Sequence, residues 1–150
     1  MDINCRNNTT SFGCLKGNML MKSSGELAKE LAEAQNSLRN CKHWHVLADE
    51  NGMRLLNTDK AKVYELADRP KRHAPNSLLI RTYDKEHKIQ GKVTSFKVEY
   101  KNMDEVKAMY KKIMSAHGIE RFVIVAKALE EQVIKRNRQN KLKHMLQTDA

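Results

Sequence analysis

Cys41, His43 and His45 are the residues whose types and spacing come closest to a chemical site. They alternate along the start of a predicted strand, so the three side chains can point to one face. Thiolate and imidazole both bind zinc or copper, and a thiol beside an imidazole can form a nucleophilic pair. A tetrahedral zinc shell needs a fourth ligand, which would have to come from a distant residue such as His73 or His87.

The hydrophobic core makes a competing demand on the same segment. Trp44, Val46 and Ala48 alternate with polar neighbours, so a core on their side of the strand sends His43 and His45 outward together. We therefore predict no metal site, no cofactor and no catalytic residue. The sequence also lacks a glycine-rich phosphate loop, a Gly-x-Ser-x-Gly elbow and a His-Glu-x-x-His helix, so a non-enzymatic protein is the preferred interpretation.

Positive charge is the strongest signal in the chain. The sequence has 28 Lys and Arg against 18 Asp and Glu, a formal net charge of +10. No acidic residue lies between Gln132 and Thr148, and a second basic group follows in a predicted loop around Pro70. Cations of this kind can neutralise backbone phosphates, so we predict a nucleic-acid-binding surface. Its residues are Arg69, Lys71, Arg72, Lys135, Arg136, Arg138, Lys141 and Lys143.

A protein-interaction or inhibitory module is the alternative, with the charge serving only solubility. In that case we expect an exposed apolar patch where Leu47 and Leu56 oppose one another on the outer face of a hairpin. A helix-turn-helix is disfavoured because its second helix would begin with Ile119 and Phe122, which require a core. The chain also has no aromatic-glycine cluster of the kind that RNA-recognition domains use.

Size and composition predict one cytoplasmic domain. A chain of 150 residues with 40% hydrophobic and 31% charged residues can bury a core of its own. The longest apolar run, residues 122–126, is far shorter than the ~20 residues needed to cross a bilayer. Residues 1–22 have no apolar signal-peptide stretch, and we expect a short strand or an extension there. Three cysteines without a Cys-x-x-Cys pair indicate free thiols.

Local patterns predict a helix followed by strands. Ser23 and Glu26 have the spacing of a capping box, and apolar residues recur every three or four positions over residues 24–40. A hairpin is predicted over residues 43–58, with Asn51-Gly52 as its type I′ turn and Asp49 opposite Arg54. Residues 60–76 are expected to be mostly irregular, although 63–66 could be a strand or a helical turn. Residues 78–83 and 93–100 read as two further strands.

Two helices are predicted towards the end of the chain. The first covers residues 103–117, with Asn102 as N-cap and Gly118 closing it. From residue 119 the spacing favours a long final helix, although residues 122–126 could also form a buried strand. After Ile134 the apolar residues are mixed with cations around the helix, so residues 135–150 are expected to be a basic helix end or tail.

The order of these elements predicts an α+β fold. It consists of an antiparallel sheet of four to five strands in two hairpins, packed by an N-terminal helix and one or two C-terminal helices. A single domain would cover residues 23–134. The functional prediction then depends on whether the basic residues, including Lys88 and Lys97, converge with residues 135–143 on one surface.

Overall fold

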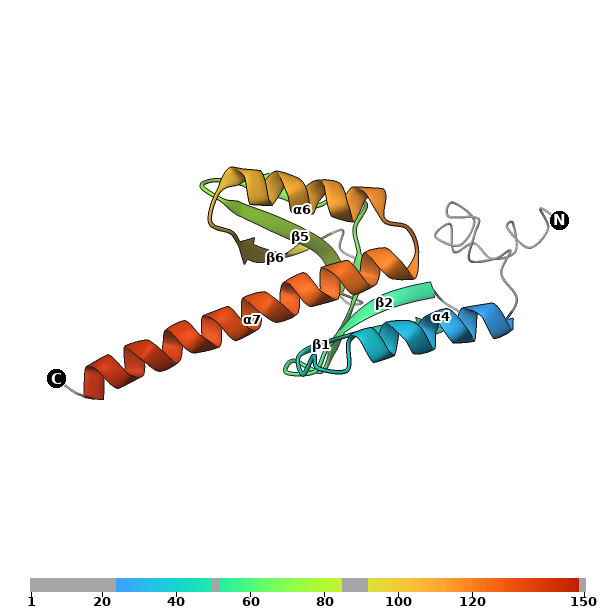
Figure 1. Cartoon of the computed structure of the whole chain (residues 1–150), viewed down its shortest axis with the longest axis horizontal. Coiled ribbons are helices and arrows are strands. Elements are labelled where there is room, and N and C mark those ends of the chain that lie inside the picture. The colour runs from blue at the N-terminus through green and yellow to red at the C-terminus, as the bar shows by residue number, and fades with distance from the viewer. Residues whose placement is uncertain (1–23, 50–51, 85–91, 149–150) are drawn as a thin grey trace.

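The chain has the predicted α+β fold (Figure 1). A computed structural model describes residues 24–49, 52–84 and 92–148, so the strand considered within residues 1–22 lies outside the described part. The elements are α4 (Ser24–Ser37), β1 (Trp44–Asp49), β2 (Gly52–Asn57), β3 (Lys62–Leu66), β4 (Lys71–His73), β5 (Ser77–Asp84), β6 (Thr94–Glu99), α6 (Met103–Ser115) and α7 (Ile119–Thr148).

All strands pair antiparallel in one sheet, in the order β1-β2-β3-β5-β4 with β6 on the other edge of β5. β3 and β4 pair with opposite ends of β5, and a hydrogen bond of 2.9 Å from Ala67 N to Arg81 O lies between them. They therefore act as one strand interrupted near Pro70. Residues 60–76 are less irregular than expected: the strand alternative for residues 63–66 is confirmed by β3, whose Tyr64 is a core residue, whereas β4 was not predicted.

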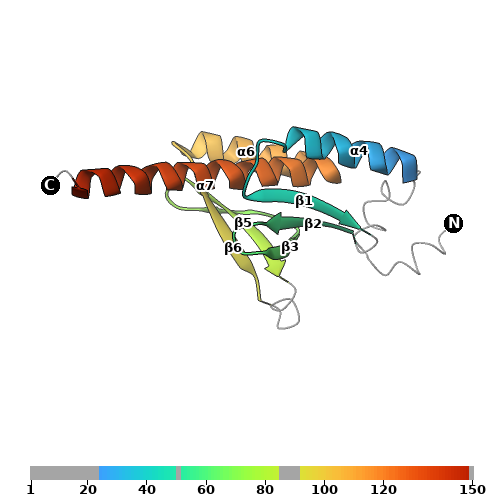
Figure 2. The same ribbon diagram turned by 90° about the horizontal axis from the view of Figure 1, so that it is seen from below.

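The three helices cover one face of this sheet (Figure 2). α7 contacts β1, β2 and β6, whereas α6 packs over β5 and α4 lies against α7 and β1. The core lies between the helices and the sheet. Its most deeply buried side chains include Trp44, Leu55, Tyr64, Leu78, Ile80, Val106, Ile113 and Val125.

The first hairpin forms, but in a different register from the predicted one. Asp49 pairs with Gly52, so the loop consists of residues 50–51, which lie outside the described residues. The predicted pair of Asp49 and Arg54 is therefore wrong. At the open end of the hairpin Thr58 N donates a hydrogen bond to His43 O at 2.9 Å. The Thr58 hydroxyl donates a second one to Lys42 O at 2.7 Å. These bonds close the hairpin in the observed register at the end away from the turn.

The predicted start of α6 is confirmed, whereas its predicted end is wrong: α6 ends at Ser115 with Ala116 as its C-cap, so Gly118 does not close it. Asn102 is the N-cap of α6, and its side chain accepts a hydrogen bond from Glu105 N at 3.0 Å. Gly118 has a φ of +59° in the turn before α7, a backbone conformation that glycine adopts without strain. Residues 122–126 are helical, and α7 continues without a break from Ile119 to Thr148. The helix therefore extends through the segment where a basic end or tail was expected.

Candidate functional site

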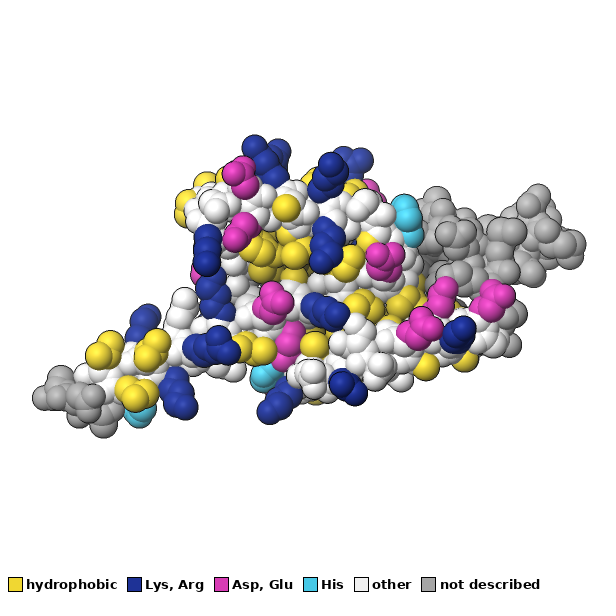
Figure 3. All heavy atoms as spheres, viewed as in Figure 1, with side chains coloured by type: hydrophobic (Ala, Val, Ile, Leu, Met, Phe, Trp, Pro, Cys, Tyr) yellow, Lys and Arg dark blue, Asp and Glu magenta, His cyan; other side chains and the backbone are white. Residues whose placement is uncertain are grey.

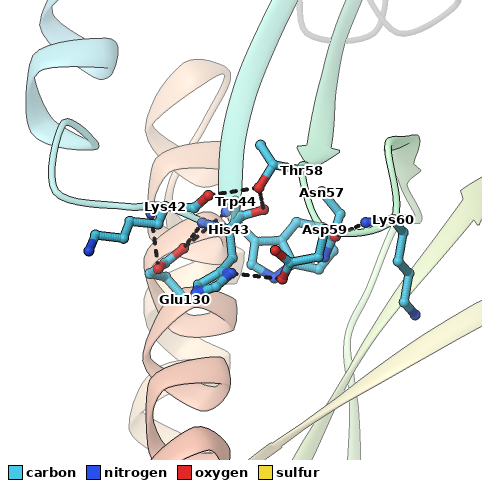
Figure 4. Close-up of polar contacts among 8 residues, drawn as sticks. All are labelled: Lys42, His43, Trp44, Asn57, Thr58, Asp59, Lys60 and Glu130. Atoms are coloured by element: carbon cyan, nitrogen blue, oxygen red, sulfur yellow. Dashed lines mark hydrogen bonds and ion pairs between the residues drawn. The ribbon is translucent and has the colours of Figure 1, made fainter.

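α7 is anchored to the sheet by a buried carboxylate (Figure 4). The side chain of Glu130 accepts hydrogen bonds from three consecutive backbone N–H groups, those of Lys42 at 3.1 Å and of His43 and Trp44 at 2.9 Å each. These N–H groups lie at the entrance to β1. A single side chain thus fixes the position of α7 relative to the first strand.

A second contact fixes where α7 crosses β6. Gln132 Oε1 accepts a hydrogen bond of 2.9 Å from Glu99 N, and Lys135 Nζ donates to Glu99 O at 3.4 Å. The last residue of β6 is therefore held between two successive turns of α7. This contact brings the first cation of the basic run against the sheet.

A cleft with a volume of about 450 Å³ opens between these two anchors. We call it the α7–β6 cleft. Trp44 and Phe96 form its aromatic part, and Leu129 and Val133 of α7 form its apolar wall. The ring centroids of Trp44 and Phe96 are 5.0 Å apart in an edge-to-face arrangement, a packing geometry that aromatic pairs prefer. The interior is therefore largely apolar, with two aromatic rings packed against each other.

Cations surround the mouth of this cleft. Lys60, Lys97 and Arg136 are exposed and line it from three different elements of the fold. Lys60 Nζ lies 5.4 Å from the centroid of the Phe96 ring, within range of a cation–π contact. Asp59 is the acidic residue of this rim, and its carboxylate pairs with His43 Nδ1 at 2.7 Å. The mouth thus carries a net positive charge above an aromatic interior.

Beyond the cleft, α7 projects from the body of the protein as an exposed helix (Figure 1). We call residues 134–148 the distal half of α7. Arg136, Arg138, Lys141 and Lys143 are all exposed there, and Figure 3 shows Lys and Arg side chains on this projection beside hydrophobic ones. Acidic side chains gather instead at the opposite end of the molecule, over α4 (Figure 3). The charge of the chain is therefore distributed unevenly along its long axis.

The structure does not bring all the predicted basic residues together. Lys135 and Arg136 lie beside Lys97, since Lys135 and Lys97 both contact Glu99 and Arg136 lines the cleft with Lys97. Arg138, Lys141 and Lys143 follow further along α7, distributed around the helix. Lys71 and Arg72 belong to β4, which pairs with the edge of β5 opposite to β6. Arg69 forms an ion pair of 3.8 Å with Asp68, and both side chains are exposed. The group at residues 69–72 is thus separated by β5 from the surface at β6, and Lys88 lies outside the described residues.

One of the arginines that contribute to the positive net charge has a structural role. Arg121 is buried, and its guanidinium donates to the carbonyl oxygens of Ile113 at 3.0 Å, Ala116 at 3.1 Å and Met114 at 3.2 Å. These carbonyls belong to the last turn of α6 and to its C-cap, Ala116, where a helix runs out of its own N–H donors; Ile113 O also accepts a hydrogen bond from Ala116 N at 3.3 Å. Arg121 therefore joins α6 to α7 and is not part of a binding surface.

The cysteine and histidines of the predicted strand do not form a chemical site in the structure. Trp44 is buried, whereas its neighbours in the sequence, His43 and His45, are both partly exposed. Cys41 precedes the strand and packs against the core, and burial together with Glu130 raises the pKa of its thiol. A nucleophilic cysteine needs a lowered pKa instead. Over residues 24–49, 52–84 and 92–148 no group of three or more His, Cys, Asp or Glu side chains is arranged to hold a metal ion.

The predicted apolar pair on the first hairpin is also changed by the register. Leu47 lies opposite Arg54, and Leu56 lies opposite His45, so the two leucines do not face each other. Both remain on the sheet face away from the helices, and Leu47 is 38% exposed. The face is thus a mixture of apolar and charged side chains.

Sequence reasoning missed Lys60, Glu130 and the cleft itself. Glu130 and Glu131 are adjacent acidic residues, a pattern that reads as solvent-exposed, yet Glu130 is buried and Glu131 is exposed. One signal was available: Glu130 follows Ala126 by four residues, which places it on the apolar face of the helix. The cleft has no local signal because its walls come from four separate segments of the chain, around Trp44, Lys60, Phe96 and Val133.

The chain matches no protein-family model, and no curated protein or solved structure is detectably similar to it. Within the part of the chain that the structure describes, no helix combines the length and the apolar character needed to span a membrane.

Proposed function

We propose that this protein is a non-enzymatic binder of nucleic acid, with α7 and the adjoining end of β6 as its binding surface. The observation that carries the proposal is the distal half of α7, which projects from the body with five cations and no acidic residue. Cations on a projecting helix can approach phosphates because the body of the protein does not stand in the way. Lys97 and Lys60 extend this surface to the cleft.

The arrangement of these cations supports contact between the distal half of α7 and the phosphate backbone of the nucleic acid, rather than recognition of individual bases. They lie on several sides of the helix, and long flexible lysine and arginine side chains can each reach a phosphate. Such binding is independent of sequence and weakens steeply with salt. We expect a cytoplasmic setting for it, as the absence of paired cysteine motifs in the sequence suggests.

Titration of labelled single-stranded and duplex DNA at about 50 mM and about 200 mM salt tests the proposal. The logarithm of the affinity must fall with the logarithm of salt, by about 0.7 per contacted phosphate for single strands and about 0.9 for duplex. No binding at the lower salt concentration would refute the proposal. Replacing Arg136, Arg138, Lys141 and Lys143 with Ala should weaken binding by at least ~10-fold and flatten the salt dependence.

The second basic group provides a matched control. In the sequence-based prediction Arg69, Lys71 and Arg72 belong to the same site, whereas the fold separates them from α7. Replacing these three with Ala removes a similar charge from another surface. We expect the salt slope to change less than in the α7 variant. An equal change in both would show that net charge rather than the α7 surface governs binding.

Protein docking is a second candidate, favoured by a specific observation. Leu142, Met145 and Leu146 are 59%, 52% and 71% exposed on the distal half of α7. Replacing the three with Ser keeps every cation and removes the apolar surface. If the protein is a docking module, this variant loses a partner that stays bound at high salt, whereas nucleic-acid binding should be largely retained.

A further inference from the structure

We infer that the α7–β6 cleft receives one unpaired base of a single-stranded nucleic acid, with the adjoining phosphates held by the cations at its mouth. This inference rests on the proposed function and specifies the form of nucleic acid that the site takes. It makes the protein selective for single strands over duplex.

The distribution of polar and apolar groups matches a nucleotide. Lys60, Lys97 and Arg136 form the outer ring of the cleft, while Trp44, Phe96 and Val133 lie further in. A nucleotide has the same division, with a charged phosphate at one end and a flat, weakly polar base at the other. Aromatic side chains bind unpaired bases of any sequence because every base offers a π-face.

Two buried amides supply hydrogen-bond donors inside the cleft. Asn57 and Gln132 line it and are only 5% and 7% exposed. Asn57 Oδ1 accepts a hydrogen bond from Lys60 N at 2.9 Å, and Gln132 Oε1 accepts one from Glu99 N at 2.9 Å. Each amide oxygen is thus occupied, and the NH2 group is the part of each side chain that remains for a ligand. Donors in these positions suit the carbonyl oxygens of thymine, uracil, cytosine or guanine.

The position of the cleft explains why a duplex cannot use it. Trp44 of β1 and Leu129 of α7 line the cleft and are almost completely buried, so a ligand can reach them only if it is narrow enough to enter between the helix and the sheet. A base within a duplex is paired and stacked, and it would have to leave both arrangements first. An unpaired base avoids most of that cost.

Lys60 shows how the aromatic ring can be made available. Its exposed side chain places Nζ over the Phe96 ring, so this ring face is covered by a solvent-exposed lysine side chain. A bound base can displace Lys60 Nζ from the ring. The displaced ammonium then lies at the mouth, where the neighbouring phosphate needs a counter-charge.

Trp44 offers a direct measurement because it is the only tryptophan of the chain and it lines the cleft. The full chain is titrated with oligothymidylate, with an abasic strand of equal length and charge, and with a duplex, while the fluorescence of Trp44 is followed. We expect the base-containing strand to alter the emission and to bind at least ~10-fold tighter than the abasic strand, in line with the energy of base stacking. The duplex should leave the emission unchanged.

Substitutions locate the effect. Val133→Phe fills the cleft, whereas Ile134→Phe adds the same ring to the next residue, which does not line it. Asn137→Phe blocks the mouth from an exposed position and serves if Val133→Phe does not fold. We expect either cleft variant to bring thymidylate binding down to the abasic level, with Ile134→Phe unchanged.

The outcomes separate this inference from the proposed function. Equal, salt-dependent binding of the abasic and base-containing strands would overturn the base site and leave the nucleic-acid-binding proposal intact. Binding of thymidylate that the cleft variants do not reduce would also overturn it. If no strand binds even at low salt, both proposals are wrong.

Discussion

The two halves of α7 belong to one continuous helix but are held by different means. In the proximal half, residues 119–133, Phe122, Val125 and Leu129 are buried in the core, and Glu130 binds the entrance to β1. In the distal half, no residue from 134 to 146 is buried. A short isolated helix is marginal in water, so the distal half depends on the proximal half as its nucleus.

This difference shows where function can be read in the molecule. In the proximal half, packing decides the residue types, and even the charged Glu130 serves the fold. In the distal half, packing makes no demand, so its concentration of cations requires another explanation. Binding residues are commonly presented in this way, on an exposed segment carried by a rigid scaffold.

The largest effect is expected from Glu130→Ala in the proximal half. The substitution leaves three backbone N–H groups without their acceptor, including the buried one of Trp44, and should lower the free energy of unfolding by about 3 kcal/mol. Urea denaturation measures this change. Glu131→Ala removes the same charge from the exposed neighbouring position and should cost less than about 0.5 kcal/mol. Similar losses in the two variants would contradict the assigned anchor.

A helix-breaking substitution in the distal half should have the opposite effect: it should weaken nucleic-acid binding and leave global stability almost unchanged. Asn140→Pro interrupts α7 beyond its last contacts with the body, so the free energy of global unfolding should change by less than about 1 kcal/mol, although proline inside a helix costs about 3 kcal/mol locally. Nucleic-acid binding should weaken by ~10-fold as the cations lose their helical arrangement. Asn140→Ala preserves the helix and should bind normally. A large loss of global stability would show that the two halves are energetically coupled.

Tyr100 probes the packing close to the point where α7 crosses β6. Its hydroxyl oxygen is buried and has no hydrogen-bond partner among the described residues, which is unfavourable. Tyr100→Phe removes this group and should raise the free energy of unfolding by up to about 1 kcal/mol at neutral pH. Thermal or urea denaturation measures the difference. A loss of stability would indicate that the hydroxyl has a partner after all.

The same residue predicts a pH dependence. Burial, with a smaller contribution from Glu131 and Glu105, raises the pKa of Tyr100 from 10.0 to about 12. Because the unfolded chain ionises this group at lower pH than the folded chain, the associated stability is complete below pH 10 and is lost as the pH rises towards 12. The Tyr100→Phe variant should therefore lose less stability over this interval than the wild-type protein. Equal losses would show that Tyr100 does not titrate in this way.

The sequence predicts the elements of this fold better than their relative positions. Apolar spacing and the Asn102 cap identify α6 and α7, because both signals arise within a few residues of one helix. The predicted register of the first hairpin is wrong because it relied on the turn alone, whereas the observed pairing also includes hydrogen bonds of Thr58 at the end remote from the turn. Residues 63–66 form β3, one of the two alternatives that the sequence left open, whereas β4 has no local signal and is held in the sheet by pairing with β5.

The candidate site was only half predictable for the same reason. The cations of the distal half are contiguous in the sequence, and their exposure follows from the absence of a clean apolar face. The α7–β6 cleft combines residues near Trp44, Lys60, Phe96 and Val133, and their proximity exists only in the folded chain. The buried polar groups in its largely apolar interior are Asn57 and Gln132, residue types that are common on surfaces.

The smallest effect on stability is expected from the His43 side chain, because only the backbone of His43 takes part in the Glu130 anchor. Glu130 holds the backbone of His43, while the imidazole contacts Asp59, which is 55% exposed. Replacing His43 and His45 with Ala keeps the backbone hydrogen bonds and removes one exposed ion pair, which is worth about 0–1 kcal/mol. We therefore expect the free energy of unfolding to fall by less than about 1 kcal/mol in urea denaturation, with Asp59→Ala giving no further loss when combined with it. A larger effect, or stoichiometric zinc in the purified protein that disappears in the double variant, would instead assign the histidines a role in metal binding.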